Sequence, residues 1–233
     1  MGLSRISNNA KVYFMPVYWR ETLPGVGCLG VWKITESEDA LRVMRPLSPM
    51  EEACIDGFAH EAVRRRSLAY RVLLERLLLR SVEIGHDSLG APFIEGEQAH
   101  LSASHSGDYA AVFYSENRTV GIDIEIIRQR VRPLRRKFMT PSEMADTAWI
   151  PEKGSCSDGW NGDDAILHVY WGGKESVYKM FSSEKPLFSS EIQISPFGLE
   201  QAESKALFCR GKQNREAVLR FKRLNDYMLV YTY

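Results

Sequence analysis

The clearest helical pattern in the chain runs from about residue 60 to residue 84. Apolar side chains recur there three and four positions apart, so they line one face of a helix, and arginines and glutamates take most other positions. The apolar positions are Leu68, Val72, Leu73, Leu77, Leu78 and Val82. Gly85 follows them and is the residue type that commonly ends a helix, so the sequence predicts a long amphipathic helix that stops before it.

Capping signals predict where other helices begin. Ser48-Pro49-Met50-Glu51 and Thr140-Pro141-Ser142-Glu143 each combine a hydroxyl for the N-cap, a proline at the first helical position and a glutamate at the third. A further helix is predicted to start near Pro133. A long one is predicted to start at Asp163 or Asp164 and to run to about residue 181.

Short runs of β-branched and aromatic residues between turn formers predict the strands. These runs are 26–34, 92–94, 100–103, 109–114, 119–127, 206–210, 217–221 and 227–231. The turn-rich stretch 151–163 is predicted to be a loop. The order strand, helices, long helix, strands occurs twice, which predicts an α+β fold of two similar α/β subdomains, residues 1–117 and 118–233.

Composition and charge describe an ordinary globular chain. It has 233 residues, 44% of them hydrophobic, and its 30 basic and 30 acidic side chains cancel. No overall field therefore favours nucleic acid or a membrane surface as a partner. Because no run is apolar enough for a secretory signal or a membrane span, we expect a cytoplasmic protein. The absence of a CxxC pair predicts reduced thiols at Cys28, Cys54, Cys156 and Cys209.

Two carboxylates share one face of the predicted strand 119–127. Side chains alternate between the faces of a strand, so Asp123 and Glu125 lie on one face and the neighbouring isoleucines on the other. Adjacent carboxylates repel each other unless water or a cation lies between them. An exposed strand face is the simpler interpretation. A divalent cation is the functional one, because Mg²⁺ prefers hard carboxylate oxygens.

The sequence WGGKESVYK lies near the end of the last predicted helix. Glu175 and Lys179 are four positions apart, as in an ordinary surface ion pair. Lys174 falls close to the apolar stripe, where a cation needs a partner. Gly172 and Gly173 each cost a helix about 1 kcal/mol relative to alanine. Either something approaches the helix backbone closely there, or the helix begins after the glycines.

A histidine stands between two serines after the predicted strand 100–103. Serine hydroxyls, backbone N–H groups of a turn and an imidazole can together hold a phosphate, which makes Ser104 and His105 candidates for phosphate binding. Taken alone, a histidine in a turn without any ligand is the more frequent case.

Together, these segments resemble the 4'-phosphopantetheinyl transferase superfamily, in its longer, monomeric branch whose two halves form a pseudo-dimer, the type that activates surfactin synthetase. The family's marks are a (V/I)GxDxE strand, a WxxKE(A/S)xxK helix and an upstream SHS turn, which appear here as VGIDIE, WGGKESVYK and ASHSGDY. The resemblance covers residues 60–180. It implies magnesium-dependent transfer of the 4'-phosphopantetheine arm of coenzyme A to a serine of an apo acyl or peptidyl carrier protein, with release of 3',5'-ADP.

The resemblance also implies a role for each matching residue. Asp123, Glu125 and Glu175 would hold Mg²⁺, and Glu175 would accept the serine proton directly or through a metal-bound water. Lys179 would face the diphosphate, and with His105 it would stabilise the charge that develops during transfer.

Coenzyme A would be held by several further contacts. Ser104 and His105 would touch its phosphates, and Arg71 would pair with the region of the 3'-phosphate. The chain departs from the family at Gly90-Ala91-Pro92, where a Gly-Lys-Pro lysine commonly touches coenzyme A. Binding should be weaker unless another cation, such as Arg66, takes over.

A basic and apolar docking face is implied because the family's carriers present their serine on an acidic helix. Residues 128–137 contain six cations in ten positions and are one candidate; the region after Phe181 is another. A solvated basic face is the simpler interpretation.

Two other functions stay open at this point. One is a non-catalytic relative that binds coenzyme A or a carrier, which Ala91 favours. The other is a metal-dependent phosphodiesterase or nuclease, which the neutral charge and the SHS segment disfavour.

Overall fold

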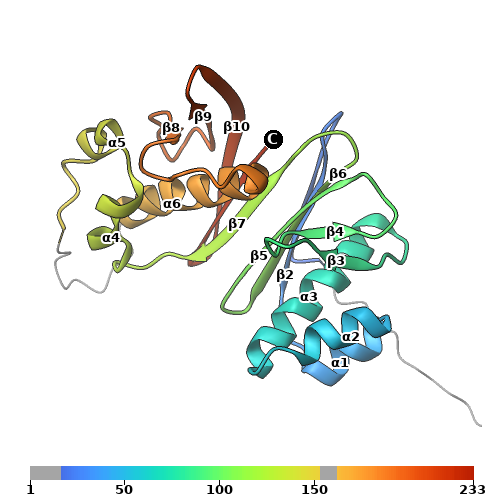
Figure 1. The fold of residues 1–233 in the computed structure, drawn as a ribbon. Coiled ribbons are helices and arrows are strands. Elements are labelled where there is room, and N and C mark those ends of the chain that lie inside the picture. Colours follow the sequence, from blue (N-terminus) through green and yellow to red (C-terminus); the bar gives the residue numbers. More distant parts are fainter. Residues whose placement is uncertain (1–16, 153–161) are drawn as a thin grey trace, which may run out of the picture.

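The computed structural model describes residues 17–152 and 162–233 (Figure 1). Residues 1–16, Cys156 and most of the predicted loop 151–163 lie outside the described residues, so the expectations for them are not tested. Helices and antiparallel sheets are combined in an α+β fold, as the sequence predicts. Within the described residues, no helix is both long and apolar enough to cross a membrane. The described cysteines are all free.

The first half of the chain forms a four-stranded antiparallel sheet in the order β1-β2-β6-β5. Its strands are β1 (Trp19–Leu23), β2 (Gly27–Lys33), β5 (His100–Ser106) and β6 (Tyr109–Ser115). A small hairpin of β3 (Ile84–His86) and β4 (Pro92–Ile94) lies beside it. The helices α1 (Glu38–Met44), α2 (Pro49–Asp56) and α3 (Glu61–Leu78) cover one face of the sheet, with Trp32, Leu73 and Val112 in the core between them.

The long helix α3 is shorter than the sequence predicts. It ends at Leu78, and Leu79 takes the left-handed conformation with φ 55°. The chain then turns away because two side chains bind the backbone of Val82. Glu75 accepts a hydrogen bond from the N–H of Val82, and Arg45 donates one to the carbonyl oxygen of Val82. Gly85 belongs to β3 and caps no helix, so the prediction for this boundary was wrong.

The second half forms a five-stranded antiparallel sheet in the order β7-β11-β10-β9-β8. Its strands are β7 (Gly121–Ile126), β8 (Ile192–Ile194), β9 (Glu203–Arg210), β10 (Gln213–Leu224) and β11 (Tyr227–Thr232). The helices are α4 (Val131–Phe138), α5 (Pro141–Asp146) and α6 (Gly162–Met180), followed by the 3-10 turn η1 (Ser182–Glu184). The predicted capping boxes at Ser48 and Thr140 are both formed.

Helix α6 packs closely on β7 and β11. A Cβ atom added at Gly172 would lie 2.7 Å from Cγ2 of Val230, and one added at Gly121 of β7 would lie 1.8 Å from the carbonyl oxygen of Ser176. The predicted close approach to the helix backbone is therefore confirmed, and the sheet makes it. The alternative that the helix begins after the glycines is wrong.

A shared core joins the two sheets, with β7 where the halves meet, next to β5 (Figure 1). Leu29 and Phe113 of the first sheet pack there with Ile122, Ile124 and Leu229 of the second. The boundary predicted at residues 117 and 118 lies in the connection from β6 to β7, where the chain leaves one sheet for the other. The two subdomains themselves stay a prediction.

Candidate active site

Strands β5 and β7 approach each other through serine side chains. The Ser102 hydroxyl accepts a hydrogen bond from the backbone N–H of Ile122 at 3.1 Å, and the Ser104 hydroxyl accepts from that of Ile124 at 3.3 Å. These hydroxyls take the place of the carbonyl partners of an ordinary sheet ladder. The acidic strand is thereby held against the SHS segment, which forms the end of β5 just before Gly107. The strand continues three residues beyond the end that the sequence predicts at residue 103.

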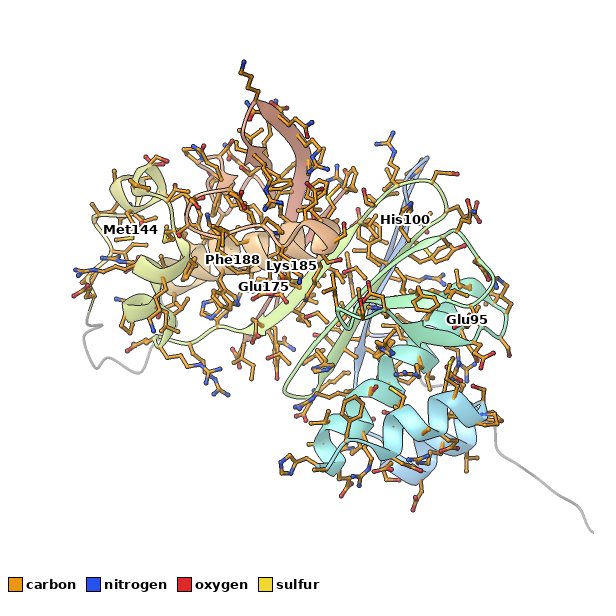
Figure 2. The ribbon with its side chains drawn as sticks, viewed as in Figure 1. Glu95, His100, Met144, Glu175, Lys185 and Phe188 are labelled. Carbon is orange, nitrogen blue, oxygen red and sulfur yellow. The ribbon has the colours of Figure 1, made fainter. Side chains whose placement is uncertain are left out.

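A cavity of about 620 Å³ opens between α3, β5, β7 and α6. It is lined by six of the predicted site residues: Ser104, His105, Asp123, Glu125, Glu175 and Lys179. They come from β5, β7 and the last two turns of α6, and Figure 2 labels Glu175 on α6 close to β7. The fold therefore brings together three segments that are far apart in the sequence.

Asp123 is held from both sides of the cavity. Its Oδ1 accepts from Nζ of Lys179 at 2.8 Å and from the Ser104 hydroxyl at 2.9 Å. Its Oδ2 is buried and has no hydrogen-bond partner. Lys179 also donates to the carbonyl oxygen of Ile122 at 2.9 Å. Lys179 therefore forms its ion pair with Asp123. The interpretation of the spacing as a surface ion pair between Glu175 and Lys179 was wrong.

The other two carboxylates are less exposed than a surface glutamate, and this changes how they titrate. Burial, with the charge of Asp123 added to it, raises the pKa of Glu125, whose Oε2 accepts from the Ser106 hydroxyl at 2.8 Å. Burial and the same aspartate raise the pKa of Glu175 to about 7, although Lys179 works in the opposite direction. Glu175 can therefore exchange a proton near neutral pH.

The residues fit a divalent cation in donor type. All three carboxylates offer hard oxygens, which divalent cations prefer. The Oδ2 of Asp123 is buried without a hydrogen-bond partner, which costs free energy, and a cation bound to it would supply the missing partner. Within residues 17–152 and 162–233, no group of three or more His, Cys, Asp or Glu is arranged so that it could already hold a metal ion. The metal-binding set Asp123, Glu125 and Glu175 stays a prediction.

His105 lines the cavity and is within electrostatic range of Arg66, the arginine that the sequence offers as a substitute cation. Burial against the cavity wall, followed by the positive charge of Arg66, lowers the pKa of His105. The Nε of Arg66 is buried without a hydrogen-bond partner. The charge of Arg66 therefore reaches His105, although Arg66 is not among the residues that line the cavity.

Arg71 is fully buried, at 0% exposure, and is not among the residues that line the cavity. Its guanidinium donates to the carbonyl and hydroxyl oxygens of Ser67, and its Nε lies 3.6 Å from Oε1 of Glu51. This position does not fit direct contact with a ligand in the cavity. Ser67, one helical turn earlier, faces the cavity in its place.

The comparisons with known proteins address the half that holds the carboxylates. Residues 119–230 match the model of the 4'-phosphopantetheinyl transferase superfamily, and this segment contains β7, α6 and β11. Residues 119–230 form a domain of the 4'-phosphopantetheinyl transferase superfamily. The resemblance read from the motifs is thereby confirmed, while the pseudo-dimeric branch stays a prediction.

Three named relatives show how far the likeness extends. The chain is 45% identical over 74 residues to 4'-phosphopantetheinyl transferase AcpT of Salmonella typhi, which is 31% of this chain and only 38% of that relative. It is 27% identical over 177 residues to the 4'-phosphopantetheinyl transferase of Bacillus subtilis, covering 66% of this chain and 75% of the relative. It is 24% identical over 194 residues to the L-aminoadipate-semialdehyde dehydrogenase-phosphopantetheinyl transferase of Xenopus laevis, covering 73% and 61%.

Sequence reasoning missed the far end of the cavity. Cys54 and Phe58 from the α2 region, Tyr70 from α3 and His86 from β3 line it. The Tyr70 hydroxyl lies 3.0 Å from Nε2 of His86, and burial, with the charge of Arg71, lowers the pKa of His86. These residues are scattered through the first half and form no motif, so no local signal could have identified them.

The basic run 128–137 is only partly a surface. Arg132 is buried and pairs with Asp164, and Arg135 is buried and donates to the carbonyl oxygens of Thr147 and Ile150. These cations hold α4 in place and cannot dock a carrier, which corrects the prediction for them. The exposed cations of the run are Arg128, Arg130, Arg136 and Lys137.

Proposed function

We propose that the chain transfers the 4'-phosphopantetheine arm of coenzyme A to a serine of an apo acyl or peptidyl carrier protein. The single observation that carries the proposal is the cavity where Asp123, with its unpartnered Oδ2, lies with Glu125, Glu175 and Lys179. The named relatives support it, since three of them from different organisms carry the name of this activity. The proposal includes action in the cytoplasm as a monomer.

The carboxylates hold the cation in this proposal. Asp123, Glu125 and Glu175 would bind Mg²⁺ through oxygen, the ligand type that this ion prefers. Mg²⁺ bound there supplies positive charge to the diphosphate oxygens of coenzyme A. Phosphoryl transfer depends mainly on positioning and on neutralising charge, which suits a cavity that gathers carboxylates beside cationic side chains.

Glu175 acts as the general base. The serine oxygen of the carrier forms a bond to the phosphorus that bears the pantetheine, and the bond from this phosphorus to the bridging oxygen breaks. The serine proton passes to Glu175, and 3',5'-ADP leaves with the bridging oxygen. Its place in the cavity beside Lys179, and the ability of a carboxylate to accept a proton, support this role.

Cationic and polar side chains hold the phosphates. Lys179 reaches the cavity from α6 and lies 2.8 Å from Asp123, so a phosphate near the carboxylates would also be near its ammonium. His105 lines the cavity, and the positive charge of Arg66 reaches it. Arg66 offers the cation that Ala91 lacks, and Gly90 and Pro92 on either side of Ala91 line the cavity. Ser104 adds a hydroxyl that also binds Asp123.

The carrier docks beside Glu125 in this proposal. A shallow hollow of about 240 Å³ lies there, with apolar Leu134 and Trp171 and the cation Arg130 in its lining. Leu134 is exposed, and so are the charges of Arg136 and Lys137 on the same helix. An acidic amphipathic helix would find both apolar contact and opposite charge on this surface.

The deciding experiment incubates the purified chain with coenzyme A, Mg²⁺ and a panel of apo carrier proteins, and weighs the carriers by mass spectrometry. We expect one phosphopantetheine added to at least one carrier, and none with the Asp123→Ala variant, whose fold circular dichroism verifies. Binding of coenzyme A without any mass gain on acyl and peptidyl carriers would contradict the proposal. It would indicate a non-catalytic relative.

A further inference from the structure

Strand β5 carries a serine at every second position from 102 to 106. Alternate side chains of a strand point to the same side, so the three hydroxyls form a row. This row faces β7, because each hydroxyl contacts a residue of that strand. The two strands run at the junction of the two sheets, where the carboxylates of the candidate site are located.

The three hydroxyls have different partners. Ser102 contacts only the backbone of β7, accepting from the N–H of Ile122 at 3.1 Å. Ser104 accepts from a backbone N–H and donates to Oδ1 of Asp123 at 2.9 Å. Ser106 donates to Oε2 of Glu125 at 2.8 Å. Along the row from Ser102 to Ser106, the partners of the hydroxyls therefore change from backbone groups to carboxylates.

We propose that Ser104 and Ser106 are positioning residues that each fix one carboxylate of the acidic strand for a divalent cation. This inference rests on the proposed function, which assigns Asp123 and Glu125 to the cation. A hydroxyl that binds one carboxylate oxygen limits the rotation of the group and leaves the other oxygen for a metal. Asp123 has this arrangement, with Oδ1 bound by a serine and Oδ2 buried without a partner.

Ser106 allows the positioning of a carboxylate to be distinguished from direct contact with a ligand. Ser104 lines the cavity and is also expected to touch a phosphate, whereas Ser106 is not among the cavity-lining residues. Its hydroxyl contacts Glu125, so its effect on a bound cation must pass through the glutamate.

The experiment measures Mn²⁺ binding to the full chain by electron paramagnetic resonance, without carrier or turnover. Ser106→Thr and Ser106→Val form the matched pair, because threonine and valine have the same shape, both suit a strand, and only threonine has the hydroxyl. Ser102→Ala is the control, since it removes a β5 hydroxyl that binds no carboxylate. Thermal unfolding of each variant shows how much of any change is loss of fold.

We expect Ser106→Val to weaken Mn²⁺ binding at least about tenfold, as is typical when a group behind a metal ligand is lost, and Ser106→Thr to bind within about threefold of wild type. Ser102→Ala should lower the unfolding temperature and leave Mn²⁺ binding within about twofold. Equal binding by Ser106→Val and Ser106→Thr would overturn the inference, and so would equal weakening by Ser102→Ala. If wild type binds no Mn²⁺, the metal assignment fails as well, whereas the carrier mass assay judges the transfer itself.

Discussion

Lys174 and Glu143 form a fully buried ion pair, with Nζ 2.8 Å from Oε2 and side-chain exposures of 0% and 1%. The same ammonium donates to the carbonyl oxygens of Phe188 and Ile192, so Lys174 ties α6 to α5 and to the segment that enters β8. Its neighbour Glu175 lines the cavity. One KE motif therefore contains a structural anchor and a functional carboxylate side by side.

Replacement of Lys174 by methionine should destabilise the protein strongly. The Glu143 carboxylate would stay buried without its cation, and we expect a loss of about 3–5 kcal/mol in the free energy of unfolding. Urea unfolding followed by circular dichroism measures the loss. The double variant Lys174→Met with Glu143→Gln is the control, because it removes the buried charge together with its partner and should recover part of the stability. A loss below about 1 kcal/mol for the single variant would argue against the anchor.

Glu175→Gln should slow transfer while leaving the fold intact. Glutamine keeps the shape of the side chain and cannot accept the serine proton, so we expect kcat to fall by about 100- to 10,000-fold. Coenzyme A binding should be partly retained, because the serine, histidine and lysine contacts remain. Turnover comes from carrier mass and coenzyme A affinity from calorimetry. Unchanged turnover would mean that another group takes the proton.

Arg66→Met should raise the pKa of His105 and weaken coenzyme A binding. The guanidinium of Arg66 lowers this pKa, so its removal makes the imidazole easier to protonate. NMR titration of the histidine ring measures the shift, and calorimetry should show coenzyme A binding about tenfold weaker, because one contact to a charged phosphate is lost. Arg65→Met is the matched control, since this neighbour donates to the carbonyl oxygen of Glu36. Equal shifts in both variants would exclude a specific role for Arg66.

Local chemistry explains what the sequence could predict of the fold. Capping boxes at Ser48 and Thr140 depend on residues three positions apart, and both are formed where predicted. The alternation in β7 correctly placed Asp123 and Glu125 on one side of the strand, because it depends on a period of two within one segment. The three motifs also converge on one cavity, as their joint resemblance to the family implies.

Long-range contacts explain what the sequence could not predict. The end of α3 depends in part on Arg45, which is 37 positions from residue 82 in the sequence and donates to its carbonyl oxygen. The sequence did not predict four short elements, namely the strands β1, β3 and β8 and the helix α1. Their stability comes from partners elsewhere in the fold, which the local pattern does not contain. Lys179 pairs with Asp123, which is 56 residues away, and not with the glutamate one turn before it. No local spacing rule could have identified that partner.

Charge reversal at the exposed cations of α4 should weaken docking of the carrier, whereas charge reversal at its buried arginine should weaken the fold. We expect Arg136→Glu combined with Lys137→Glu to raise the KM for the carrier about tenfold or more and to reduce its salt dependence, with the KM for coenzyme A unchanged. Arg135→Glu is the contrasting variant, because Arg135 is buried and its loss should lower the unfolding temperature. Steady-state kinetics at two salt concentrations provide the measurement. An unchanged KM for the carrier in the double variant would exclude this face.

The stability of the fold should depend on pH through His168. His168 is buried, its Nδ1 lies 2.7 Å from the carbonyl oxygen of Asp164, and its Nε2 accepts from the N–H of Arg128 at 3.3 Å. Burial lowers the pKa of His168 below the ordinary value of 6.5, although the Asp164 carbonyl works in the opposite direction. The unfolded chain therefore binds this proton first as the pH falls below 6.5, and the folded state loses stability until its own lowered pKa is passed.

His168→Gln removes this group from the titration. The free energy of unfolding of wild type should fall between pH 6.5 and the lowered pKa by up to about 1.4 kcal/mol per pH unit from this histidine, and the variant should lack that part of the slope. His100→Gln is the control, because it replaces a half-buried histidine at the first residue of β5 that does not line the cavity. Urea unfolding at several pH values between 5 and 7.5 compares the three proteins. Equal slopes for wild type and His168→Gln would show that His168 titrates alike in the folded and unfolded chain.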